Sequence, residues 1–211
     1  YGARRDIVLS IIANGLSSDG NASDLNKIFT SGEIVSDKEP FSSIEVRTIN
    51  QIPGNFLYMN AKDKVYNLMK NIDLPKNFIF EFDVIAQPNE NENNASFYLS
   101  FFNSDNDYMD DGIYPGREGV NIGMSSYNWD VSGYAEEKNI NNSNSEISPL
   151  KNSEVQHVII WIQNRRLRIY YNQQKVIDGP TLIHPGVSFN RLRFSQWGGA
   201  GHHFISNLKI T

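Results

Sequence analysis

Alternation of apolar and polar side chains is the clearest pattern in the chain, and it is strongest between Leu74 and Ala86. Successive side chains of a β-strand point to opposite faces, so every second residue of this segment shares a face. The pattern predicts a strand that buries one face completely. The expected buried face holds Phe78, Phe80, Phe82 and Val84, and the opposite face holds Ile79, Glu81, Asp83 and Ile85.

Similar short runs, separated by turn residues, continue to the end of the chain. Tight turns near Asn164 and at Asn172–Gln174 predict a β-meander in the third quarter. Trp161 alternates with Ile159 and is expected in the core, whereas the Asn- and Ser-rich segment Asn139–Ser145 is expected to be a mobile loop. The other expected strands are Phe97–Phe102, Val120–Met124, Trp129–Tyr134, Val155–Gln163, Leu167–Tyr171, Lys175–Asp178, Arg191–Ser195 and Phe204–Ile210.

Many strands and few helices indicate an all-β fold, a two-sheet antiparallel β-sandwich of the jelly-roll type. The first 31 residues differ, because Ile7, Val8, Ile11 and Ile12 have helical spacing and Ser23 could cap a second short helix. We therefore expect a helical prelude or linker over residues 1–31 and a sandwich domain over residues 32–211.

Composition narrows the function classes. The 211 residues carry a net charge of -5, and the basic residues form no face of the kind that binds nucleic acid. The chain has no cysteine, so disulfides and thiolate metal sites are excluded. It contains no run of about 18 apolar residues, so we expect no membrane-spanning helix.

Four segments carry a resemblance to a known family. They are LPKNFIFEFDV, VQHVIIWIQNRRLRIYYNQQKVID, SFNRLRFS and HFISNLKIT. In this order they resemble concanavalin A-like (laminin G-like) jelly rolls, and most of all the lectin-like domain found upstream of OmpA-like domains in Gram-negative outer-membrane proteins. The resemblance covers residues 32–211. It implies a lectin-like module that is secreted, periplasmic or associated with the outer membrane.

Two carboxylates in the first strong strand invite comparison with glycoside hydrolases of the same fold. Family 16 enzymes use a Glu-x-Asp-x-Glu pattern on one strand, and Glu81 and Asp83 match its first half. Ile85 stands where the second Glu is needed, although a retaining glycosidase requires both a nucleophile and an acid/base. The favoured interpretation is a solvated or turn-bonding polar face, so no catalytic residue is assigned.

An acidic loop is the candidate metal site. Calcium prefers several oxygen ligands, often carboxylates from one loop. A solvated loop is the favoured interpretation, and Ca²⁺ is the one cofactor that the loop could hold. Its candidate ligands are Asp105, Asp107, Asp110 and Asp111.

Aromatic rings beside polar side chains are the candidate ligand site, because sugar rings stack on exposed aromatics while polar groups bind their hydroxyls. Most aromatics of a sandwich lie in its core, which is the competing interpretation. The four histidines are expected to be structural, with His202 and His203 on opposite faces of a strand. The candidate ligand-binding residues are Tyr127, Asn128, Trp129, Asp130 and Trp197.

These observations favour a non-catalytic lectin-like binding module of the bacterial cell envelope or secreted fraction, with a glycan or an envelope protein as its partner. Two alternatives stay open. One is a structural, protein-interaction subunit of an outer-membrane assembly that docks through the helical prelude. The other is a glycoside hydrolase of the same fold.

Overall fold

The computed structural model describes residues 42–49, 52–60, 68–87, 95–103, 114–136, 138–147, 149–150, 154–196 and 201–211. The helices expected over residues 1–31 lie outside this set, so the domain boundary stays a prediction. None of the described segments is a helix long and apolar enough to cross a membrane.

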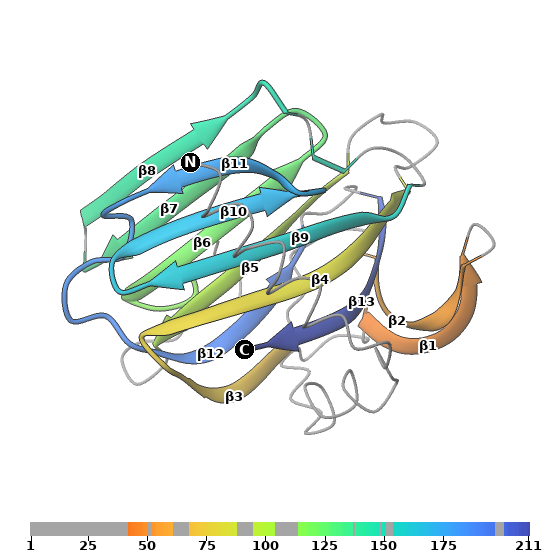
Figure 1. The fold of residues 1–211 in the computed structure, drawn as a ribbon. Helices are drawn as coiled ribbons and strands as arrows, with labels where there is room; N and C mark the ends of the chain where they lie inside the picture. Colours follow the sequence, from red (N-terminus) through yellow and green to blue (C-terminus); the bar gives the residue numbers. More distant parts are fainter. Residues whose placement is uncertain are drawn as a thin grey trace.

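Antiparallel strands in two sheets form the described part of the chain (Figure 1). The seven-stranded sheet has the order β1-β2-β13-β4-β9-β10-β11, and the six-stranded sheet has the order β3-β12-β5-β6-β7-β8. This arrangement confirms the expected β-sandwich. The strands are β1 (Ser42–Ile49), β2 (Ile52–Asn60), β3 (Leu68–Leu74), β4 (Asn77–Gln87), β5 (Ser96–Asn103), β6 (Glu118–Ser125), β7 (Trp129–Ala135), β8 (Lys138–Asn144), β9 (Gln156–Gln163), β10 (Arg166–Tyr171), β11 (Gln174–Gly179), β12 (Phe189–Ser195) and β13 (His202–Ile210).

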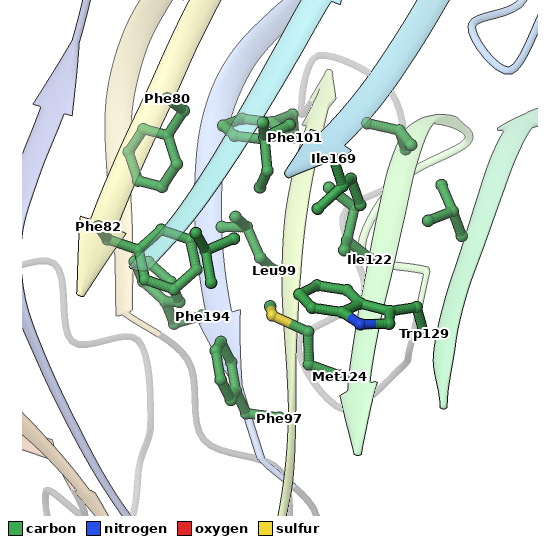
Figure 2. Close-up of a cluster of buried hydrophobic side chains, with 14 of the residues drawn as sticks. Phe80, Phe82, Phe97, Leu99, Phe101, Ile122, Met124, Trp129, Ile169 and Phe194 are labelled. Atoms are coloured by element: carbon green, nitrogen blue, oxygen red, sulfur yellow. The ribbon is translucent and has the colours of Figure 1, made fainter. Parts of the chain in front are cut away.

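The core lies between the sheets and is filled by the alternate residues that the sequence pattern singled out. Phe80 and Phe82 of β4 are fully buried, and the Phe80 ring meets the Phe101 ring edge to face at 5.5 Å. Figure 2 shows these rings with Phe97 and Phe194 from the opposite sheet. Edge-to-face pairs place the positive edge of one ring against the negative face of another, which adds to the gain from burial.

The expected turns are confirmed, and they explain how β9, β10 and β11 form a meander. Asn172 and Gln173 have φ of 45° and 70° between β10 and β11. Positive φ at both central residues is typical of the two-residue hairpin turn whose twist matches that of the strands. Asn164, between β9 and β10, also has a positive φ of 53°.

Two expectations in this region are wrong. Asn139–Ser145 is not a loop, because most of it forms β8, which pairs with β7 through its backbone along the sheet edge. Side chains on an edge strand can stay in water, so their polarity does not reveal the pairing. Trp161 is half-buried on the outer side of its sheet, where Arg168 stacks over its ring at 4.7 Å. Its neighbours Ile160 and Ile162 take the core side.

Trp129 corrects another expectation, since its ring was expected to stack on a ligand. The side chain has 0% of its surface exposed and lies in the core beside Met124 (Figure 2). The Tyr171 ring of the other sheet contacts it edge to face at 5.4 Å. Trp129 and Val131 both point inward, because alternate residues of β7 share a face.

Replacing Trp129 should therefore unfold the protein more easily. We expect Trp129→Ala to lower the free energy of unfolding by about 3–5 kcal/mol, because it leaves a large cavity between the sheets. Urea denaturation measures the change. Tyr127→Ala is the matched control, since Tyr127 is 64% exposed, and it should change stability by less than about 0.5 kcal/mol. Equal effects of the two substitutions would contradict this assignment of the core.

His202 and His203 point to opposite faces of β13, as expected. The ring of His202 stacks on Tyr58 at 5.7 Å and accepts or donates a 2.6 Å hydrogen bond with its hydroxyl. His203 is fully buried and contacts the Phe97 ring at 5.2 Å. Burial lowers the pKa of His203 to about 3, so its ring is neutral in the folded protein.

A neutral buried histidine makes stability depend on pH. Below pH 6.5 the unfolded chain protonates His203 and the folded chain does not, so stability falls as pH drops from 6.5 toward 3. We expect a loss approaching about 1.4 kcal/mol per pH unit. Denaturation curves between pH 6.5 and 4.5 measure this slope. His203→Gln should reduce it, and an unchanged slope in that variant would refute the assignment.

Candidate functional site

The residues expected to bind a ligand lie around the turn that joins β6 to β7. Tyr127 projects from the turn and Asp130 is exposed at the start of β7. Asn128 holds the turn closed, because its Oδ1 accepts a 2.7 Å hydrogen bond from the Ser125 hydroxyl. Trp197 lies outside the described residues. The structure thus brings three of the expected residues to one end of the six-stranded sheet, while the Trp129 ring points away from them into the core.

Behind this turn stretches a surface that the sequence analysis did not identify. Leu192 and Phe194 of β12 and Leu99 and Phe101 of β5 point into the core, so their neighbours point outward. We name the outward side chains of β12, β5, β6, β7 and β8 the polar face. Across these strands, in that order, the first rung holds Arg191, Phe102, Gly119, Tyr134 and Asn139, the second Arg193, Ser100, Asn121, Ser132 and Asn141, and the third Ser195, Tyr98, Gly123, Asp130 and Ser143.

The second rung is a line of polar side chains across the sheet. Ser100 donates a 2.8 Å hydrogen bond to Oδ1 of Asn121, and both residues are buried. Ser132 and Arg193 are buried as well, although they face away from the core. Toward β8 the face opens, because Asn141 and Ser143 are exposed. The polar face therefore has a closed half at β12 and β5 and an open half at β7 and β8.

Two glycines of β6 let tyrosine rings lie against the sheet. A Cβ atom at Gly119 would lie 2.8 Å from the Tyr134 hydroxyl, and one at Gly123 would lie 2.9 Å from Cε1 of Tyr98. Any larger residue would push these rings away. The glycines thus place Tyr134 and Tyr98 on either side of Asn121, so that polar groups lie between two aromatic rings.

The Tyr134 ring is anchored by a small aromatic cluster on the first rung. It meets the Tyr114 ring edge to face at 4.9 Å and packs with Phe102. Tyr114 donates a 3.4 Å hydrogen bond to the Ser132 hydroxyl. Burial raises the pKa of the Tyr134 hydroxyl, so this group stays protonated and can donate a hydrogen bond.

The carboxylate pair of β4 lies on the other sheet. Glu81 and Asp83 share the outward face of that sheet as expected, but Glu81 is only 3% exposed rather than solvated. His157 of β9 lies between them, with Nδ1 2.6 Å from Asp83 and Nε2 3.6 Å from Glu81. Asn207 donates a 2.6 Å hydrogen bond to Asp83.

This arrangement joins three neighbouring strands by charge. Burial by itself lowers the pKa of His157, but the carboxylates of Asp83 and Glu81 outweigh it and raise the pKa to about 9. The ring is therefore a cation at neutral pH. The register that sets Asp83 beside His157 joins residues 74 positions apart, so alternation within one strand could not have revealed the pairing.

No cluster of three or more His, Asp or Glu side chains among the described residues is placed to hold a metal ion. The four aspartates proposed as calcium ligands lie outside those residues, so calcium binding there stays a prediction. They are Asp105, Asp107, Asp110 and Asp111.

Comparison with known proteins adds evidence on the fold. No family model matches the chain, and no curated protein matches its sequence. Among solved structures, the carbohydrate recognition domain of Emp47p is similar over 84% of this chain and 90% of its own, with a TM-score of 0.57 and 12% identity. A galectin-like protein from Bacillus subtilis, titled as of unknown function, covers 82% and 86%, with a TM-score of 0.54 and 9% identity.

The carbohydrate-binding module CBM66 from Bacillus subtilis is similar over 74% of this chain and 86% of its own, with a TM-score of 0.50 and 14% identity. Likeness at such low identity establishes the fold alone. The chain therefore has the lectin-type jelly-roll fold expected from its resemblance to concanavalin A-like domains. The finer likeness to domains upstream of OmpA-like domains stays a prediction.

Proposed function

We propose that the chain is a non-catalytic glycan-binding module and that the polar face is its site. A pyranose ring has apolar C–H faces and a rim of hydroxyls, so it suits an aromatic ring flanked by polar side chains. The third rung offers this combination, because it holds Tyr98, Asp130 and Ser143 across neighbouring strands. This rung is the observation that carries the proposal.

Access to the site comes from the open half of the face. Asp130 and Ser143 are exposed, Tyr98 is half-buried, and Tyr127 extends from the adjacent turn. The carboxylate of Asp130 can accept hydrogen bonds from two sugar hydroxyls, while Ser143 can donate and accept. The closed half behind them is held rigid by the Ser100–Asn121 hydrogen bond, so binding orders few side chains.

The similar solved structures support this proposal by their titles, since two of them are a carbohydrate recognition domain and a carbohydrate-binding module. The segments that resemble lectin-like domains of Gram-negative outer-membrane proteins support a location in the cell envelope or the secreted fraction. Both supports are independent of the third rung, which was found from strand register.

A glycan array followed by calorimetry tests the proposal. We expect the wild-type chain to bind at least one glycan class, and Asp130→Asn and Tyr98→Ala each to weaken binding by about tenfold or more, equivalent to about 1.4 kcal/mol. Glu154→Gln is the matched control, because Glu154 is exposed just before β9 and lies off the polar face. It should bind as the wild type does.

The same samples separate the alternatives. Release of reducing sugar from a bound glycan would indicate a glycoside hydrolase instead of a binding module. If the folded chain retains no glycan, or if both variants of the third rung bind as tightly as the wild type, the proposal is wrong. A structural, protein-interaction role would then be the leading hypothesis.

A further inference from the structure

We infer that the glycan is acidic and that its carboxylates bind along β12, an inference that rests on the proposed glycan-binding function. The outward residues of β12 are Arg191, Arg193 and Ser195, which alternate with core residues. Consecutive outward residues of a strand lie about 6–7 Å apart. Two guanidinium groups therefore lie side by side at one border of the polar face.

Arg191 is the residue on which the inference depends. It is half-buried, and its Nε is excluded from water with no hydrogen-bond partner. None of the ion pairs between described residues involves it; those ion pairs centre on Asp178 and on the carboxylates beside His157, all on the seven-stranded sheet. A guanidinium partly removed from water without an anion is costly, and a bound carboxylate would remove that cost.

Two further donors on the same face also lack partners. The Ser195 hydroxyl and the Tyr134 hydroxyl are both buried and make no hydrogen bond. Each can donate, as can Arg191, so the face near β12 has an excess of donors. A ligand that supplies acceptors and negative charge matches this excess, whereas a neutral sugar, with one donor on every hydroxyl, matches it less well.

The face itself holds little charge to compensate. Asp130 is the one acidic side chain on the three rungs, and it lies on β7, three strands from β12. Neighbouring strands are about 4.8 Å apart, so the separation across the sheet is about 14 Å. A ligand that contacts both borders must therefore be an oligosaccharide of several units, with its carboxylates toward β12 and neutral hydroxyls toward Asp130.

Guanidinium groups bind carboxylates through two parallel hydrogen bonds, which an ammonium group cannot do. The ligand class that follows is a uronic acid oligosaccharide. Its recognition should be sensitive to charge and to guanidinium geometry at Arg191, and it should weaken as salt screens the attraction.

Calorimetry with three uronic acid polysaccharides, polygalacturonate, alginate and hyaluronate, tests the inference against their methyl esters, in which the carboxylates are neutral. We expect wild-type chain to bind at least one acid form at least tenfold more tightly than its ester, and less tightly at 200 mM than at 50 mM NaCl. Arg191→Gln should remove most of this preference, and Arg191→Lys should restore it only in part. Lys76→Gln, which removes the same charge from an exposed turn, should retain it.

The outcomes separate this inference from the function on which it rests. Equal binding of acid and ester forms, or full preference in Arg191→Gln, overturns the acidic ligand but leaves glycan binding intact. Glycans bound on the array but no acid form bound in solution has the same meaning. No binding of any glycan by the folded wild-type chain overturns both.

Discussion

The burial of aromatic and branched side chains between two sheets is the constraint on which the rest of the molecule depends. Each strand contributes alternate residues to that layer, and the rings of Phe80, Phe82 and Phe194 interlock across it. Burying apolar surface contributes about 25 cal/mol per Å², so a core of this size outweighs the cost of burying polar groups elsewhere. Once the inward residues are set, the outward residues of every strand are set as well.

That coupling explains how far the sequence alone could lead. Alternation predicted β4, the β9–β11 meander and the sandwich, because periodicity and turn residues are local. It failed for Trp161 and Trp129, where either face of a strand could have taken the ring. It also failed for β8, whose asparagines give no apolar signal and whose pairing with β7 is made by the backbone.

The polar face could not be predicted because it depends on register. Tyr98, Gly123 and Asp130 come from three strands, and nothing within each strand indicates that they share a rung. The same holds for His157 and Asp83 on the other sheet. Of the expected ligand-binding residues, Asp130 lies on the face and Tyr127 beside it, because both were chosen from a turn and a strand start that the sequence did locate.

The glycines beneath the two tyrosines suggest how such a fold can diversify. Gly119 and Gly123 contribute nothing to the core, yet they decide how closely Tyr134 and Tyr98 approach the sheet. A change at either position would reshape the binding surface while leaving the inward residues of β6 intact. Evolution could therefore vary ligand preference and scaffold stability almost separately, which accounts for similar jelly rolls at 9% to 14% identity.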